Sequence, residues 1–348
     1  MSRADPALVV GDLAAALDTI ADHNSGRPMP LISDAHVHAL HGQRLAPVAD
    51  QPPILVPRGE SAKSWATLAA IVDELALRAI PRGTPLLALG GGSVGDIAAL
   101  AASLFKRGTP VIHIPTTLLA QTDSAVGGKT GLNSAGTKNI AGTFHPPALV
   151  VADPALLDTL DRRQLVAGYA EVVKYGLIDD PAFFAWCEAH GRALIDGDRS
   201  ARTHAVRHCL AAKARLVRGD ERDLGGTRTL LNLGHSFGHA IESAAGLGRL
   251  LHGEAVAVGL TLALRFSAFL RLCPPANADR LAVHLAAVGL PTRLDEVGLK
   301  GADLGRWMAH DKKNSASVRT LVLAHGIGRA FVARAVDEAA LVAFLAAA

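Results

Sequence analysis

The sequence predicts an α/β protein in which a parallel sheet comes first and a helical domain follows. Short apolar runs alternate with helical patterns through the first half of the chain, and a glycine-rich turn joins one such run to a helix at 90–96. After about residue 159, alanine- and leucine-rich helical segments dominate. Strands that alternate with helices are typical of a parallel sheet covered on both faces. We therefore expect an α/β domain over 1–158 and an all-helical domain over 159–348.

The individual elements follow from the apolar patterns. Buried strands are expected at 30–33, 54–57, 86–89, 111–115 and 148–153. Asp34, directly after the first of these strands, would cap a helix. Further helices are expected at 66–79, 97–105, 163–177, 181–193, 202–218, 230–244, 253–269 and 277–288.

The composition limits the class of protein. The chain has 348 residues, of which 49% are hydrophobic and 19% charged, which favours a large buried core over disorder. The net charge is +3 and no run of lysine or arginine stands out, so we expect no nucleic-acid or membrane partner but a small anionic substrate. The three cysteines lack CxxC spacing and the N-terminus lacks a signal-peptide pattern, which predicts a cytoplasmic protein.

The glycine turn GGGSVGD at 90–96 is the first candidate binding element. It follows an apolar run and precedes a helix, where glycines allow a pyrophosphate to approach the backbone and the helix N-terminus supplies N–H donors. The pattern departs from GxGxxG. An ordinary tight turn of an α/β protein is therefore the alternative interpretation.

The segment 115–139 is rich in small and polar residues and contains Lys129 and Lys138. Long loops inside compact domains are usually functional, and lysine beside glycine suits phosphate or carboxylate binding. The alternative is a solvated loop with two ordinary surface lysines.

Three histidines, His235, His239 and His252, fall within 232–254. The first two lie four residues apart and share a helix face, and neutral imidazole suits a divalent transition metal. Glu171 and Lys174 lie on a helix that is expected to be buried, so Glu171 is a plausible third ligand. A structural Glu–Lys pair is the alternative.

Together these segments resemble the 3-dehydroquinate synthase family of the sugar phosphate cyclases. The motifs GGGSVGD, PTTLLAQTDSAVGGKT, AEVVKYG, NLGHSFGHAIE and LHGEAVA occur in order between about residue 31 and the DKKN at 311–314. The resemblance implies an N-terminal NAD-binding domain and a C-terminal domain that binds metal and substrate, with the active site between them. It also implies a homodimer.

The resemblance further assigns residues to three sites. The metal, Zn²⁺ or Co²⁺, would be bound by Glu171, His235 and His252. NAD would lie against Asp34, Glu60, Lys63, Gly92, Gly95, Asp96, Thr116, Thr117, Lys129, Lys138 and Thr159. Catalysis and substrate binding would fall to Arg107, Asp123, Lys129, Asn139, Lys174, Lys213, Arg228, Asn232, His239 and Lys312. The resemblance implies that Arg107 reaches across a dimer interface.

The reaction that the resemblance implies is the conversion of 3-deoxy-D-arabino-heptulosonate 7-phosphate to 3-dehydroquinate and phosphate, in the shikimate pathway to aromatic amino acids. It is a phosphate elimination, assisted by a transient oxidation by NAD and closed by an aldol step. The substrate carries a phosphate and a carboxylate, which suits several lysines and arginines. The alternatives are another sugar phosphate cyclase, a metal-dependent polyol dehydrogenase of the glycerol dehydrogenase type, and a non-catalytic NAD- or metal-binding regulator.

The sequence departs from the family pattern in details that bear on NAD affinity. His36 stands where an asparagine is usual, and Gln164 replaces a common glutamate. The N-terminus is short, so we expect the opening strands of the family to be missing or reduced.

Overall fold

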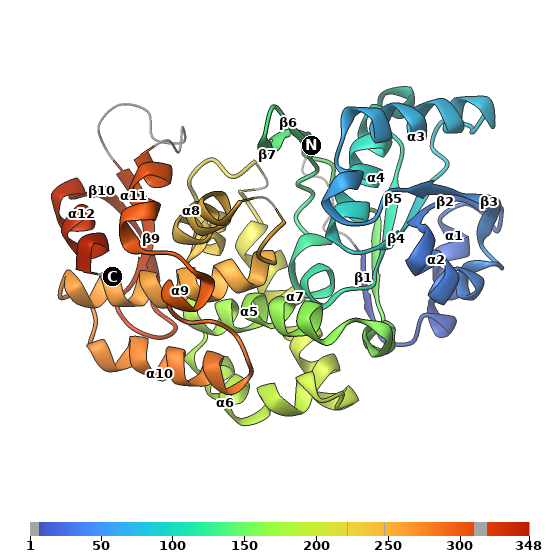
Figure 1. Cartoon of the computed structure of the whole chain (residues 1–348). Helices are drawn as coiled ribbons and strands as arrows, with labels where there is room; N and C mark the ends of the chain where they lie inside the picture. The colour runs from blue at the N-terminus through green and yellow to red at the C-terminus, as the bar shows by residue number, and fades with distance from the viewer. Residues whose placement is uncertain (1–6, 221, 247, 310–318, 348) are drawn as a thin grey trace. The chain divides into compact units, whose positions relative to one another are not determined.

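The computed structural model describes residues 7–220, 222–246, 248–309 and 319–347, and Figure 1 shows their course. The chain divides into two compact units. Unit 1 comprises Met1–Asp161 and Arg202–Arg222, and unit 2 comprises Arg162–Ala201 and Asp223–Ala348. This division places 202–222 with the α/β part, whereas the sequence prediction assigned it to the helical domain.

Unit 1 is built on a six-stranded sheet whose neighbouring strands are parallel, in the order β1-β8-β5-β4-β2-β3. The strands are β1 (Ala7–Val10), β2 (Met29–Asp34), β3 (Ala49–Val56), β4 (Leu86–Gly90), β5 (Val111–Pro115) and β8 (Leu149–Ala152). The five predicted strands are present, and β1 is an opening strand that the sequence analysis expected to be missing or reduced. The chain runs from β2 outward to β3 and then returns to β4 on the other side of β2, so the strand order reverses beside β4. Ligands of open α/β sheets bind at the carboxyl ends of strands at such a reversal.

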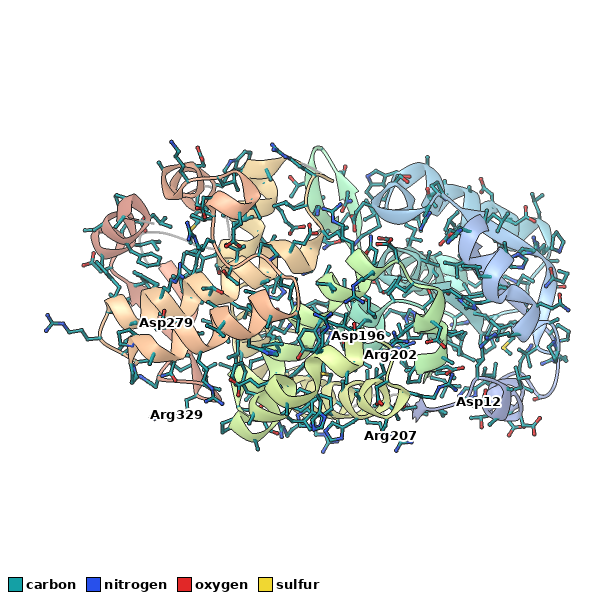
Figure 2. All side chains as sticks on the ribbon, turned by 60° about the horizontal axis from the view of Figure 1, so that its bottom comes forward. Asp12, Asp196, Arg202, Arg207, Asp279 and Arg329 are labelled. Atoms are coloured by element: carbon teal, nitrogen blue, oxygen red, sulfur yellow. The ribbon has the colours of Figure 1, made fainter. Side chains whose placement is uncertain are left out.

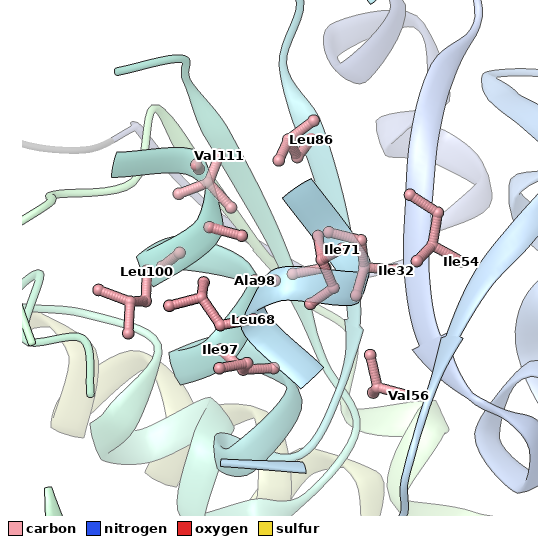
Figure 3. Close-up of a cluster of buried hydrophobic side chains, with 14 of the residues drawn as sticks. Ile32, Ile54, Val56, Leu68, Ile71, Leu86, Ile97, Ala98, Leu100 and Val111 are labelled. Atoms are coloured by element: carbon pink, nitrogen blue, oxygen red, sulfur yellow. The ribbon is translucent and has the colours of Figure 1, made fainter. Parts of the chain in front are cut away.

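The helices of unit 1 connect these strands and cover the sheet. They are α1 (Leu17–Asp22), α2 (Ala35–His41), α3 (Trp65–Leu77) and α4 (Gly92–Leu104). Figure 3 shows the core between the sheet and the helices α3 and α4. Its side chains include Ile32, Ile54, Val56, Leu86 and Val111 from the strands and Leu68, Ile71, Ile97, Ala98 and Leu100 from the two helices. The opposite face buries a second cluster, which includes Leu31, Leu87, Leu89, Ile112 and Ile114.

The segment 115–139 has more regular structure than the long loop that the sequence predicted. It contains a one-turn π-helix, η5 (Ala120–Ser124), and a hairpin of the antiparallel strands β6 (Leu132–Ser134) and β7 (Thr137–Ala141). The two turn residues of the hairpin, Ala135 (φ 49°) and Gly136 (φ 74°), both have positive φ, as tight hairpin turns require. The strands were missed because most of their residues are polar or small and no apolar alternation marks them.

The helix α7 (Arg199–Val217) begins in unit 2, and its residues from Arg202 onward belong to unit 1. Arg202 pairs with Asp158 (2.6 Å), and the guanidinium of Arg207 donates to the carbonyl of Val10 (3.2 Å). Both arginines are labelled in Figure 2. These contacts attach the second half of the helix to the α/β unit.

Unit 2 is mostly helical, as predicted. Its helices are α5 (Arg162–Ile178), α6 (Pro181–Ile195), α8 (His235–Ala245), α9 (His252–Phe269), α10 (Pro275–Ala287), α11 (Gly301–Ala309) and α12 (Glu338–Ala347). The nearly fully buried α9 packs against α5, α8 and α10. Unit 2 also holds an antiparallel ribbon, β9 (Arg319–Ala324) and β10 (Ala330–Val336), so the prediction of an all-helical domain was wrong in this respect. Among the described residues, no helix combines the length and apolar character needed to cross a membrane.

Candidate active site

The structure brings the three predicted metal ligands of unit 2 together. Glu171 comes from the middle of α5, and His235 and His252 are the first residues of α8 and α9. One ligand atom from each lies within 4.8 Å of the others. The Oε1 atom of Glu171 is 3.4 Å from Nε2 of His235 and 3.5 Å from Nε2 of His252. Two imidazole nitrogens and one carboxylate oxygen form a donor set that suits Zn²⁺.

Close backbone contacts between helices create this cluster. A Cβ atom on Gly253 would lie 1.7 Å from the carbonyl oxygen of Ala167, so only glycine lets the start of α9 approach α5. Ala167 precedes Glu171 by one helical turn, which sets His252 beside the carboxylate. A Cβ atom on Gly259 would likewise lie 2.2 Å from the carbonyl oxygen of Gly234, directly before α8.

The carboxylate of Glu171 is fully buried. It pairs with Lys174 and also faces the two histidines, so the two interpretations that the sequence left open, a Glu–Lys pair and a metal ligand, are compatible. Its Oε2 atom pairs with Nζ of Lys174 at 2.5 Å, while Oε1 faces the two histidines. Lys174 is only 1% exposed. The Glu–Lys pair and the histidine cluster are therefore parts of one arrangement.

The two histidines differ in protonation. Burial lowers the pKa of His235 to about 3, although the negative charge of Glu171 acts to raise it. Burial also lowers the pKa of His252, but hydrogen bonds to Glu171 and Glu242 outweigh it and raise the pKa to about 10. The two carboxylates lie beside different ring nitrogens, Glu171 beside Nε2 and Glu242 beside Nδ1, and together they prevail over burial. A metal ion at this cluster must displace the proton of His252.

Three further predicted residues of unit 2 lie on the chain that leads into α8 or on α8 itself. Arg228, 3% exposed, and the half-buried Asn232 belong to the 3₁₀-helix η7 (Thr227–Asn232). His239 is exposed one turn after His235, with their ring centroids 5.6 Å apart. Lys312 lies outside the described residues.

In unit 1, the glycine turn between β4 and α4 forms a cradle that larger residues would fill. A Cβ atom on Gly91 would lie 3.0 Å from the side chain of Thr117, and one on Gly92 would lie 3.0 Å from Oγ of Ser124. Within the described residues, that Oγ atom is buried and has no hydrogen-bond partner. A pocket lies here, lined by residues that include Gly90, Gly92, Gly95, Asp96, Ser124 and Lys129. This cradle at a helix N-terminus fits a pyrophosphate.

Predicted cofactor residues cluster beside the cradle. Nζ of Lys63, which is 4% exposed, donates to Oδ2 of Asp96 (2.6 Å) and to the side-chain oxygen of Asn139. Burial raises the pKa of Asp96, and the charge of Lys63 opposes that shift. Glu60 accepts hydrogen bonds from Ser93 (3.2 Å) and Asn133 (2.8 Å).

Asn133 is therefore a member of this cluster that the sequence analysis missed. Its backbone N–H also bonds to the carbonyl of Lys63 (2.9 Å). Asn133 and Asn139 lie on the two strands of the hairpin, so the hairpin is attached to the cradle. The half-buried Lys138 is the neighbour of Asn139 on β7.

Asp123 and Lys213, which were predicted to bind substrate, pair with each other. Nζ of Lys213 donates to the carbonyl of Asp123 (2.6 Å) and forms an ion pair with its carboxylate. Asp123 lies on the π-helix η5, and such one-turn irregularities are frequent at functional sites. Lys213 is 7% exposed, so the pair holds a nearly buried ammonium group in place.

Lys129 has an exposed side chain on a firmly held backbone. Lys129 forms an antiparallel β-bridge with Phe144. On either side of it, the N–H of His145 donates to the carbonyl of Gly128 (2.7 Å) and the N–H of Thr130 donates to the carbonyl of Thr143 (3.0 Å). The ring of His145 also bonds to the carbonyl of Thr109 through Nε2 (2.8 Å).

Four other predicted residues of unit 1 form hydrogen bonds within that unit. Asp34 caps α2, as predicted, by accepting from the N–H of Val37 (3.0 Å). Oγ1 of Thr117 accepts a hydrogen bond from the backbone N–H of Ala120, and the backbone N–H of Thr116 donates to the carbonyl of Gly90. Oγ1 of Thr159 forms a hydrogen bond with Nε2 of His41. Arg107 is exposed on the 3₁₀-helix η4 (Phe105–Arg107) with φ 67°.

Comparison with known proteins agrees with this arrangement. Family models of the 3-dehydroquinate synthase N-terminal and C-terminal parts match residues 53–167 and 168–314. A 3-dehydroquinate synthase of Rhodospirillum rubrum is 53% identical over 331 residues, which cover 91% of this chain and 85% of the relative. One of Zymomonas mobilis is 49% identical over 295 residues, or 84% of this chain and 78% of the relative.

Among solved structures, the 2-epi-5-epi-valiolone synthase of Streptomyces hygroscopicus, with NAD⁺ and Zn²⁺ bound, superposes with a TM-score of 0.89. It is 31% identical, and the match covers 99% of this chain and 97% of that one. The two family models together span well over half of the chain, and the curated relatives match it at about half identity along most of its length. The chain thus belongs to the 3-dehydroquinate synthase family.

Proposed function

We propose that this chain is a 3-dehydroquinate synthase, a carbon–oxygen lyase that converts 3-deoxy-D-arabino-heptulosonate 7-phosphate into 3-dehydroquinate and phosphate. The observation that carries the proposal is the cluster of Glu171, His235 and His252 in a chain 53% identical to a 3-dehydroquinate synthase. The reaction would belong to the shikimate pathway of aromatic amino acid biosynthesis.

The donor set supports a Zn²⁺ or Co²⁺ ion held by Glu171, His235 and His252. Three protein ligands leave a coordination position for substrate, as in catalytic rather than structural zinc sites. The glycine cradle of unit 1 supports NAD, with its pyrophosphate against Gly92 and the N-terminus of α4. When bound, the metal would supply Lewis-acid chemistry to the reacting hydroxyl, and NAD would take up and return a hydride.

The chain's own residues would bind and orient the anionic substrate. Lys213 and Arg228 are nearly buried cations, and charge-assisted hydrogen bonds are stronger where water is excluded. Asp123 would hold the ammonium group of Lys213 in position, and Lys129 would present its charge from a fixed backbone. The exposed imidazole of His239 would assist proton transfer or phosphate binding.

One alternative has an observation in its favour. The structural likeness to a 2-epi-5-epi-valiolone synthase favours a sugar phosphate cyclase. The family resemblance implies that cyclases whose substrates lack a carboxylate lose part of the cationic set. The presence of both Lys213 and Arg228 supports the carboxylate-bearing substrate. A regulator that has lost catalysis is disfavoured because no metal ligand is missing.

The assembly and location are also proposals. We propose a homodimer in which Arg107, exposed on η4, contributes to the site of the partner subunit. We further propose that the protein acts in the cytoplasm on a small molecule and has no nucleic-acid or membrane partner.

The test follows phosphate release and NADH absorbance together. The protein is incubated with the heptulosonate phosphate, with NAD⁺ below the substrate concentration, and with Zn²⁺. Phosphate released without net NADH, and lost on chelation, is the expected result. Activity with a sugar phosphate that lacks the carboxylate, but not with the heptulosonate, would indicate another cyclase. NADH accumulating with a simple polyol would indicate a dehydrogenase.

A further inference from the structure

The imidazole of His252 has a carboxylate on each side. Its Nε2 atom faces Oε1 of Glu171 at 3.5 Å, and its Nδ1 atom lies 3.2 Å from Oε2 of Glu242. Glu242 is 7% exposed on α8. It is the last residue of the motif NLGHSFGHAIE, but the sequence analysis assigned it no role. It follows His235 by seven residues, or two helical turns, so α8 presents a metal ligand and this carboxylate on the same face.

We propose that Glu242 is a positioning residue that accepts the Nδ1 proton of His252 and thereby orients its Nε2 atom toward the metal. This inference rests on the metal centre proposed above. A ligating histidine usually donates its other ring N–H to a carboxylate or carbonyl, which fixes the tautomer and makes the ligand more basic.

The two histidine ligands are supported differently. Nδ1 of His235 lies 3.2 Å from the carbonyl of Leu233, which is neutral, whereas the partner of His252 is a carboxylate. His252 also begins α9, whose start is held by the contact through Gly253, by the bond from the N–H of Leu251 to Glu254 (2.9 Å) and by the bond from the N–H of Glu254 to the carbonyl of Leu251 (3.0 Å). The side chain of His252 is 31% exposed against 13% for His235, so its ring depends more on a side-chain partner.

The geometry also allows a second metal site that would include Glu242 and His252. His239, Glu242 and His252 also bring one ligand atom each within 4.8 Å of the others. A second metal ion there would have to bind Nδ1 of His252, which would then lose both ring protons. A proton on Nδ1 shared with Glu242 keeps the ring neutral, and for that reason we assign the positioning role.

The experiment measures Zn²⁺ affinity by competition with a chelator, and metal content per chain, in Glu242→Leu and Glu242→Gln. Leucine removes the acceptor, and the affinity should fall by about 10–100-fold, the usual effect of losing such a partner. Glutamine keeps a neutral acceptor oxygen and should restore part of the affinity. The visible spectrum of the Co²⁺-loaded protein should change with leucine more than with glutamine.

Glu188→Gln is the matched control. Glu188 pairs with Arg280 (2.5 Å) in the same unit, and its substitution should leave Zn²⁺ affinity unchanged. Wild-type affinity in Glu242→Leu would overturn the positioning role. Two ions per chain, reduced to one by His239→Ala, would replace it with the second metal site. A wild-type protein that binds no metal would instead refute the proposed metal centre itself.

Discussion

At the scale of single residues, the chemistry depends on charged groups held out of water. Glu171 and Lys174 are 0% and 1% exposed, and the charge of each makes the burial of the other less costly. The same carboxylate faces two histidines, so its charge is shared between a structural partner and the proposed metal. Stability and metal binding are therefore linked at this pair.

Lys174→Met tests that link. The substitution leaves the charge of Glu171 buried without its ammonium partner, which should cost about 3–5 kcal/mol of unfolding free energy in the metal-free protein. With Zn²⁺ bound the loss should be smaller, because the metal supplies positive charge. Urea unfolding with and without Zn²⁺ measures both values, and an equal loss in the two forms would contradict the link. In the double variant Glu171→Gln/Lys174→Met, part of the stability should return.

At the scale of elements, close helix contacts set the site. Gly253→Ala places a methyl group where the carbonyl of Ala167 lies, so α9 must move away from α5. Such overpacking typically costs about 1–3 kcal/mol, and Zn²⁺ affinity should fall because His252 moves from Glu171. Thermal unfolding and chelator competition measure the two effects.

Gly305→Ala is the control for this prediction. Gly305 lies within α11, and a Cβ atom there would meet no atom of the described residues within 4 Å. Alanine should leave metal binding unchanged and stabilise the helix by about 0.5–1 kcal/mol. If both alanine variants bind Zn²⁺ equally well, the contact at Gly253 does not set the site.

The strand β5 carries a buried histidine whose protonation affects stability. Burial, followed by the charge of His145, lowers the pKa of His113 to about 4. In the unfolded chain this group titrates near 6.5, so between pH 6.5 and 4 the unfolded state binds the extra proton. The contribution of His113 to stability is therefore lost as pH falls through this range.

His113→Gln removes this titration. The free energy of unfolding of the wild type should fall more steeply between pH 7 and pH 5 than that of the variant. Urea unfolding at a series of pH values measures the two slopes. Identical slopes would show that His113 does not hold its neutral form in the folded protein.

At the scale of the whole molecule, the sequence was informative where burial leaves a continuous apolar pattern. The strands β4, β5 and β8 are fully buried and were predicted almost to the residue. The hairpin of β6 and β7 was missed because its short, half-exposed strands carry little apolar signal. The ribbon of β9 and β10 was missed although residues 321–324 of β9 are apolar and buried, because periodicity alone does not distinguish such a short apolar run from part of a buried helix.

The site was predictable in part, for a similar reason. Motif spacing identified Glu171, His235 and His252, which the fold then brings together. It assigned no role to Asn133, nor to Glu242 at the end of the motif NLGHSFGHAIE, because their contacts depend on how a hairpin and a helix pack. Nor could helical periodicity show that the part of α7 carrying Lys213 joins the α/β unit, because periodicity does not specify the packing partner.

The most direct test of the proposed function is the fate of one hydrogen. The heptulosonate phosphate is labelled with deuterium on the carbon whose hydroxyl is oxidised, and it is converted in ordinary water with NAD⁺ present at a small fraction of the substrate. If the same cofactor takes up and returns the hydride within one turnover, the carbocyclic product keeps the deuterium and no reduced cofactor accumulates. Loss of the label from the product, or labelled NADH released in proportion to turnover, would contradict the proposal that this chain is a cyclase of this kind.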